Sequence, residues 1–432
     1  SVKPNDGAGD FTFSRGSNIS ATRVNADGNI EKGRENVVLY SNKFDESYWQ
    51  KLSGCSILGQ TATDPFGVAN NAWLVNFDGT TNGRLEKQVS GSQVKTMSIY
   101  VRTQSGTQDV IIGFGGNELV TKTITTTWQR IEKFTPDNIY PRLRCDSATT
   151  LEVFGFQVEL GLVATPYIES GATTGKAGIL EDMPRIDFSG GNQSLLLEPS
   201  RTNEFSHSEY LGEPNSQAYN VTIAANAAIS PEGLNNAYSL ISNTGANEHF
   251  LGMYWYGAAS GGTETFSVYA KANGYDWLYL RTNTGSWSTA HANFNLATGE
   301  KGLIGSGLNS SSIVDMGNGW YRCSITYSNR AVSARLQITS RPSEGASSVF
   351  TADGTSGAYI YGAQLEEASY ATSYIPTYGV SQTRLVETID RLILPESLGT
   401  EFTIFFDTEL FQSGNGLLIF EDVNNAEVYK FY

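Results

Sequence analysis

The stretch YGAQLEEASYATSYIP, at residues 361–376, decides the architecture, because the chain contains a close counterpart of it. Residues 154–168 read FGFQVELGLVATPYI. Four further matches occur in the same order: 41–49 with 202–210 (SNKFDESYW and TNEFSHSEY), 64–73 with 230–238, 96–102 with 265–271, and Trp128 with Trp320. The separation grows from 161 residues (41 to 202) to 207 residues (154 to 361). Matches in a fixed order with growing spacing indicate a duplicated domain whose second copy has longer loops.

Apolar and polar residues alternate within the matched segments, as in a half-buried antiparallel strand. The apolar positions of residues 96–102 and 265–271 are Met97, Ile99, Val101, Phe266, Val268 and Ala270. The closing segment shows the same period, with Phe154, Phe156 and Val158 on one side and Gly155, Gln157 and Glu159 on the other. Since Trp128 and Trp320 recur at strand starts, we expect both to belong to the cores.

These patterns predict an all-β protein of tandem antiparallel β-sandwiches, jelly-roll-like in topology and joined by ordered connectors. The predicted parts are an N-terminal lead-in (1–37), a first sandwich (38–170), a connector (171–200), a second sandwich (201–378), and a connector with the start of a third β-rich unit (379–432). We expect strands at Thr403–Phe406 and twice more within residues 413–432.

Composition excludes several classes of protein. A net charge of -15 makes binding to a nucleic-acid polyanion improbable. Cys55, Cys145 and Cys323 are odd in number and widely spaced, so we expect buried thiols and no disulfide framework. The sequence has no apolar run of the length of a membrane span, so no membrane insertion is expected.

Several phrases resemble bacteriophage virion appendage proteins of the tail-fibre and head-fibre type, which contain repeated carbohydrate-binding-module-like jelly rolls. The phrases are FTFSRGSNISATRVNADGNIE (11–31), LYSNKFDESYW (39–49), PRIDFSGGNQSLLLEPSRTN (184–203) and YGAQLEEASYATSYIPT (361–377). In addition, GTEFTIFFDTELF (399–411) resembles the start of a concanavalin or laminin-G-like domain. The family shares no catalytic residue set, so the resemblance supplies no catalytic residues.

The resemblance implies a structural component on the exterior of a phage particle, with other virion proteins and a host cell-surface glycan as partners. It also implies a homo-oligomer, which we expect to be a trimer. Three alternatives stay open: a secreted bacterial pair of carbohydrate-binding modules, a capsule depolymerase whose active site lies outside this segment, and an adaptor that binds only virion proteins.

An enzyme is not expected, because the sequence lacks the motifs that carry common chemistries. There is no HExxH, no phosphate-binding P-loop, no Rossmann glycine fingerprint and no nucleophile elbow in a suitable context. No cofactor is predicted either, apart from a structural calcium ion, for which the sequence offers oxygen ligands.

The candidate ligand site lies in the second copy. In YDWLYLRT, Trp277, Tyr279 and Arg281 share one face of the predicted strand, where QDVIIGF of the first copy has Asp109, Ile111 and Gly113. Aromatic rings at alternate positions can stack on sugars while an arginine binds their hydroxyls. Trp255 and Trp287 are the other candidate glycan-binding residues. Glycan contact, packing against another subunit and ordinary core packing all remain open for these side chains.

Gln157 with Glu159, and Gln364 with Glu366, recur on the polar side of the closing strand. Carboxylate and amide oxygens suit calcium, so Glu159 and Glu366 are candidates for metal ligands. The favoured interpretation is a hydrogen-bond network that ties the lead-in to the sandwich.

Overall fold

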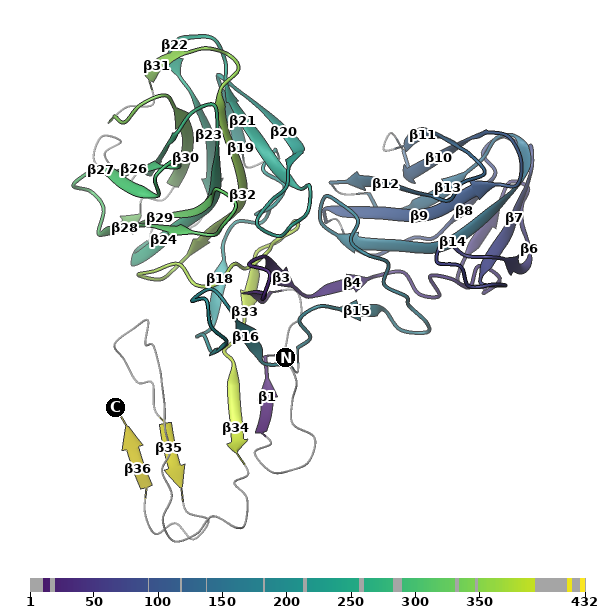
Figure 1. Cartoon of the computed structure of the whole chain (residues 1–432), viewed down its shortest axis with the longest axis horizontal. Helices are drawn as coiled ribbons and strands as arrows, with labels where there is room; N and C mark the ends of the chain where they lie inside the picture. Colours follow the sequence, from purple (N-terminus) through teal and green to yellow (C-terminus); the bar gives the residue numbers. More distant parts are fainter. Residues whose placement is uncertain are drawn as a thin grey trace. The chain divides into compact units, whose positions relative to one another are not determined.

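The computed structural model describes residues 11–15, 20–91, 93–116, 119–136, 138–181, 183–212, 216–255, 260–282, 290–330, 334–345, 349–392, 418–421 and 428–431. The described residues form strands and turns, with no helix among them. Figure 1 shows each sandwich as two sheets packed face to face. The predicted all-β fold class, with antiparallel β-sandwiches, is therefore confirmed.

Sandwich one consists of two five-stranded sheets. The β14 sheet has the order β12-β9-β14-β7-β6, with β6 (Cys55–Ala62), β7 (Ala72–Asp78), β9 (Lys95–Thr103), β12 (Gln129–Thr135) and β14 (Ala148–Leu160). The β10 sheet has the order β11-β10-β13-β8-β5, with β5 (Gln50–Leu52), β8 (Arg84–Glu86), β10 (Gln108–Phe114), β11 (Leu119–Ile124) and β13 (Pro141–Arg144). Apolar side chains from both sheets, such as Ile99 and Ile112, form one buried cluster.

Sandwich two repeats this plan with six strands in each sheet. The β32 sheet has the order β20-β21-β32-β24-β29-β28, with β20 (Val221–Ala228), β21 (Ala237–Ser242), β24 (Ser260–Asn273), β28 (Ser310–Asp315), β29 (Trp320–Arg330) and β32 (Gly357–Glu366). The β25 sheet has the order β19-β23-β30-β25-β26-β27, with β19 (Ser216–Tyr219), β23 (Phe250–Trp255), β25 (Trp277–Thr282), β26 (His291–Asn295), β27 (Glu300–Ile304) and β30 (Ala334–Arg341).

Short two-stranded ladders make up the rest. The ladders are β1 (Phe11–Ser14) with β34 (Thr388–Leu392), β2 (Thr22–Val24) with β3 (Ile30–Lys32), β4 (Arg34–Asn36) with β15 (Gly175–Ala177), β16 (Arg185–Asp187) with β17 (Ser194–Leu196), β18 (Arg201–Asn203) with β33 (Gln382–Arg384), β22 (Gly245–Glu248) with β31 (Val349–Ala352), and β35 (Leu418–Glu421) with β36 (Val428–Phe431). Chain contacts place both sandwiches in one compact unit that reaches Asp390, and β35 and β36 in a second. The strand expected at Thr403–Phe406 lies outside the described residues.

The closing strands depart from simple alternation. Phe154 pairs with Tyr100 on the outer face of the β14 sheet, whereas Phe156 belongs to the core between the sheets. A β-bulge separates them, and Gly155 within it has φ +62°. A bulge inserts one residue and thereby moves the following side chains to the other face. The prediction that Phe154, Phe156 and Val158 share one side is therefore wrong for Phe154.

Buried charges join the connectors to sandwich two. Three arginines and two glutamates form one network: Arg15, Arg185, Arg384, Glu198 and Glu387. Arg185 also donates to the Thr22 carbonyl and to Ser373, which brings in the hairpin β2–β3 and the segment after β32. Buried ion pairs that lose one partner are costly, so these contacts fix the segments to one another.

Candidate functional site

The outer face of the β25 sheet carries the candidate glycan residues in three rows. Antiparallel register sets the rows, since residues directly opposite one another on neighbouring strands share a face. They are Asn295–Trp277–Arg341, Asn293–Tyr279–Thr339 and His291–Arg281–Gln337. Trp277, Tyr279 and Arg281 do share one face, as their spacing predicts, while Leu278 and Leu280 belong to the core.

Tyr279, in the middle row, is fully buried. Its ring centroid lies 5.4 Å from that of His291, and the Arg341 guanidinium lies 5.6 Å from the centre of the ring. Burial raises the pKa of the Tyr279 hydroxyl. A ring in this position cannot stack on a sugar, so the predicted role of Tyr279 as a glycan-binding residue is wrong. Alternation in the sequence identifies the face of a strand but not what covers it.

Trp277, at one end of this face, is only half-buried. A Cβ on Gly302 of β27 would lie 2.5 Å from the Trp277 ring, so the indole lies directly over that glycine. The exposed Glu344 carboxylate borders the same position and accepts a hydrogen bond from the Leu303 amide. An indole, a carboxylate and the half-exposed Asn295 therefore meet at this end of the face.

Arg281, at the other end, is held by polar neighbours. Its guanidinium donates to Gln337 and lies 3.1 Å from a carboxylate oxygen of Glu248. Within the described residues, Gln337 Nε2 and Thr339 Oγ1 have no hydrogen-bond partner although both side chains are buried. Buried polar groups without a partner are rare in folded proteins. These two groups could therefore still form hydrogen bonds at this face.

The side chains of the other two predicted glycan-binding residues, Trp255 and Trp287, are not described. Trp255 is the last residue of β23, but its side chain is outside the described part of the chain, and Trp287 lies entirely outside it.

Sandwich one has a charged face where sandwich two has the aromatic one. Asp109 of β10 is exposed and its carboxylate accepts a hydrogen bond from Thr123. Across the sheet, the Glu86 carboxylate lies 3.0 Å from Arg84 Nε and 2.9 Å from Arg142. The aromatic row is thus a feature of the second copy.

The metal candidates Glu159 and Glu366 lie in a pair of equivalent hydrogen-bond networks. Thr165 donates to Glu159 through its amide, at 2.8 Å, and through its hydroxyl, at 2.6 Å. Thr372 donates to Glu366 in the same two ways, with an amide distance of 3.0 Å. Among the described residues, no three His, Cys, Asp or Glu side chains cluster in a way that could hold a metal ion. The geometry therefore gives both carboxylates a hydrogen-bonding role in the turn that follows the closing strand.

An asparagine missed by the sequence comparison completes each network. Asn36 Nδ2 donates to the carbonyls of Phe156 and Ile168, and its Oδ1 accepts from the Val158 amide. Asn203 makes the corresponding bonds in sandwich two. The equivalent residues are therefore 36 and 203, and the alignment of 41–49 with 202–210 is wrong by six positions. The R-x-N pattern shared by Arg34–Asn36 and Arg201–Asn203 was the available signal.

The recurrent tryptophans differ in burial. Trp320 is buried, as expected of a core residue, whereas Trp128 is half-buried beneath the Arg102 guanidinium, at 4.8 Å. Both indoles donate to the carbonyl of an equivalent turn residue, Thr63 in sandwich one and Ile229 in sandwich two.

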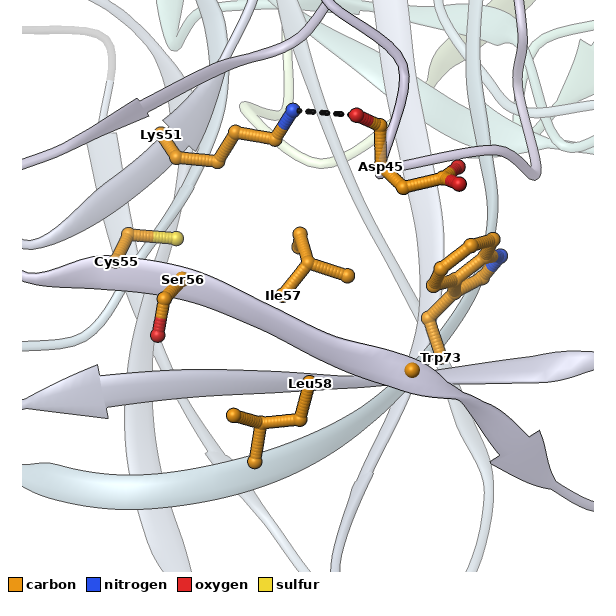
Figure 2. A pocket seen from close by; sticks show the side chains of 8 residues that line it. Asp45, Lys51, Cys55, Ser56, Ile57, Leu58 and Trp73 are labelled. Carbon is orange, nitrogen blue, oxygen red and sulfur yellow. Dashed lines mark hydrogen bonds between the residues drawn. The ribbon is translucent and has the colours of Figure 1, made fainter.

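A solvent-open depression of about 530 Å³ lies at the edge of sandwich one, along β6. Figure 2 shows Lys51 reaching the backbone oxygen of Asp45 across it, with Trp73 at one end. Cys55 in its wall is buried, and burial raises the pKa of its thiol to about 12. The wall offers one amine and one carboxylate, with no converging pair of acids of the kind that cleaves glycosidic bonds.

No protein-family model matches the chain, and no curated protein matches it. Among solved structures, the chain is similar to the family 11 carbohydrate-binding module of a cellulosomal cellulase of Clostridium thermocellum, with 13% identity, 31% of this chain and 98% of that chain covered, and a TM-score of 0.22. It is also similar to an oxalate decarboxylase of Lactobacillus farciminis in complex with formate (6% identity, 77% and 88% covered, TM-score 0.15). A vicilin of Corylus avellana, the hazelnut, is a third (8% identity, 77% and 88% covered, TM-score 0.13). At such low TM-scores these likenesses say nothing about what the chain binds. None of the described residues forms a helix that is long and apolar enough to cross a membrane.

Proposed function

We propose that this chain is a non-enzymatic, architectural component of a bacteriophage appendage, on the exterior of the particle and in contact with other virion proteins. We base this on the structural role of the sequence phrases that resemble appendage proteins: their polar residues form buried contacts between segments of the chain. Arg185 and Glu198, from PRIDFSGGNQSLLLEPSRTN, belong to the buried ion network, and Asn203 from the same phrase binds the closing strand at Ala363 and Leu365. Glu366 and Thr372, from the closing phrase, hold the turn that follows that strand.

The recurring polar residues therefore join segments to one another. Their hydrogen-bonding groups are buried and bound to backbone and hydroxyl partners, which is the arrangement expected of structural joints. A catalytic group would instead have to be reachable from a cleft.

Two measurements test this proposal. An antibody raised against residues 1–432 should label purified phage particles, and labelling confined to a soluble secreted fraction would overturn the virion assignment. Incubation with capsular polysaccharide should release no reducing ends, and their release would overturn the non-enzymatic assignment.

We further propose that sandwich two contacts glycans at the Trp277 end of its outer face. The half-buried indole offers a flat apolar surface, and Glu344 and Asn295 lie where sugar hydroxyls would need acceptors and donors. Single sites of this size bind weakly, and many copies on one particle raise the effective concentration.

Binding of purified protein to intact candidate host cells tests the glycan site. Trp277→Ala should reduce saturable binding at least tenfold while leaving the unfolding transition of sandwich two in place. Asp109→Ala changes the equivalent position of sandwich one and is the matched control, for which binding should not change. Equal binding by the Trp277→Ala protein would exclude this site.

A further inference from the structure

The hairpin β2–β3 covers part of the outer face of the β32 sheet. Ile30 is 4% exposed, and its amide donates to the Pro231 carbonyl at 2.8 Å. It packs in a buried cluster with Ala237, Tyr269, Trp320, Tyr361 and Tyr374. Residues that precede sandwich one in the chain therefore complete the surface of sandwich two.

Charges reinforce this contact. Lys32 Nζ lies 2.6 Å from a carboxylate oxygen of Glu209 and 3.2 Å from one of Glu232. Arg34 pairs with Glu232 as well, and the Tyr361 hydroxyl donates to the same carboxylate at 3.0 Å. Lys32 of the hairpin and Arg34 of β4 thus meet acidic side chains of sandwich two. We define the socket of sandwich two as the outer face of the β32 sheet together with Glu209 and the turn at 230–234.

Sandwich one has an equivalent surface, which we call its socket: the outer face of the β14 sheet with the turn at 64–68. Its turn at 64–68 closes with the same two backbone bonds as the turn at 230–234, Asp64 to Val68 and Gly67 to Asp64. Tyr100 and Phe154 pair in the same way as Tyr269 and Tyr361. At the turn position that Glu232 occupies in sandwich two, sandwich one has Phe66.

No hairpin described in the structure covers the socket of sandwich one. Phe66 is 63% exposed, although its ring contacts those of Tyr100, at 5.7 Å, and Phe154, at 5.9 Å. A Cβ on Gly67 would meet open space, whereas one on the equivalent Gly233 would meet Asn29 of the hairpin, at 3.4 Å.

The hairpin β16–β17 is the counterpart of β2–β3 and exposes apolar side chains. In each hairpin the residue after an arginine pairs with an aliphatic residue, Val24 with Ile30 and Ile186 with Leu195. Ile30 is buried, but Leu195 is 43% exposed and Leu197, just beyond β17, is 47% exposed.

We propose that the hairpin β16–β17 of one molecule docks on the socket of sandwich one in a second copy of this chain. The pair in contact combines lysine and arginine with glutamate, and the two surfaces that are not paired within the described part of the chain combine leucine with phenylalanine. Both of these surfaces are apolar where the paired ones are charged, so each fits the other and neither fits the surfaces already paired.

Hydrogen bonds anchor β16–β17 beside β2–β3 within its own chain, and a second copy supplies the sandwich-one socket that the hairpin meets. The Val24 amide donates to the Asp187 carboxylate at 2.7 Å, and Arg185 donates to the Thr22 carbonyl. A hairpin on one molecule and a socket on the next form a head-to-tail contact, which closes into a ring or continues as a filament. This contact is independent of the glycan site at Trp277.

Sedimentation of the full chain over about two decades of concentration tests the proposal. The parent should self-associate, and Phe66→Glu should weaken association at least tenfold, as should Leu197→Lys. The Phe66→Glu substitution introduces the residue that the equivalent turn carries in sandwich two. Because the contacts of the ring with Tyr100 and Phe154 are lost, it should lower the unfolding temperature of sandwich one slightly while the protein stays folded.

The combined variant Phe66→Glu/Leu197→Lys provides the most specific test in the same sedimentation experiment. It should regain association, now weakened by salt, because the new pair copies the chemistry of Lys32 with Glu232. A parent that stays monomeric throughout would overturn the proposal. So would a Leu197→Lys variant that unfolds more easily but associates like the parent, since Leu197 would then pack within its own chain.

Discussion

Asn36 and Asn203 make the same three hydrogen bonds in the two sandwiches. Each side chain connects a short strand, β4 for Asn36 and β18 for Asn203, to the closing strand and to the segment that follows it. We expect Asn203→Ala to lower the free energy of unfolding of sandwich two by about 3 kcal/mol, because two carbonyls and one amide lose their partner. Chemical denaturation followed by tryptophan fluorescence measures this change.

Asn192→Ala, at an exposed position in the turn of β16–β17, is the matched control, and its effect should stay within about 0.5 kcal/mol. An Asn203→Ala protein as stable as this control would contradict the proposed role.

Gly155 and Gly362 should tolerate no side chain. Their φ angles are +62° and +60°, and a Cβ would lie 3.0 Å from the Tyr167 ring or 3.1 Å from the Tyr269 ring. Gly362→Ala should therefore cost about 2–3 kcal/mol of stability, measured by calorimetry. Gly28→Ala has a similar backbone angle, +81°, but open space around the new methyl group, so it should cost clearly less. Equal losses would show that the ring contact is unimportant.

Lys32 and Glu209 form a buried ion pair. Removing one charge alone should lower the free energy of unfolding more than removing both. Among the described residues, Lys32→Met leaves the buried Glu209 carboxylate with only the hydroxyls of Tyr374 and Tyr378 as donors, and it should cost about 3 kcal/mol. Adding Glu209→Gln removes the unpaired charge and should restore at least about 1 kcal/mol. A double-mutant cycle on unfolding free energies checks this, and strictly additive losses would contradict it.

The stability contribution of Lys32 should depend on pH. Burial lowers the pKa of its ammonium from 10.5 to about 7, an effect that the nearby Glu209 carboxylate partly offsets. Between these values the unfolded chain binds a proton that the folded chain lacks, so stability should rise with pH by about 1 kcal/mol per unit. The difference between the parent and Lys32→Met, measured from about pH 7 to pH 9, should show this slope. A constant difference would mean that the folded lysine keeps its proton.

The three cysteines should be inert in the folded protein. Cys55, Cys145 and Cys323 are buried, and burial raises the pKa of each thiol, to about 12 for Cys55. Since the thiolate is the reactive form, an aromatic disulfide reagent should modify none of them before unfolding and all three afterwards. Rapid reaction of any one in the native protein would disprove its burial.

The sequence was sufficient to predict the duplication and the two-layer fold, since a buried face imposes a period of two on every strand that lines it. It failed at Phe154 because one inserted residue reverses the alternation without leaving a gap in the pattern. It failed at Tyr279 because packing from elsewhere in the fold determines burial. The alignment of 41–49 with 202–210 failed because a similar string, SNKF and TNEF, hid the equivalence of two single asparagines.

Phe66 in sandwich one and Glu232 in sandwich two stand at equivalent positions, and this difference also affects how the chain avoids misassembly. Two similar modules in one polypeptide can trade partners while they fold, which is a common failure of repeated domains. If the β2–β3 hairpin settled on the wrong sandwich, Lys32 would be buried against Phe66 in place of the Glu232 carboxylate, at a cost of several kcal/mol. The difference between Phe66 and Glu232, in two turns that share their backbone hydrogen bonds, thus gives each nascent module a means of rejecting the other's hairpin.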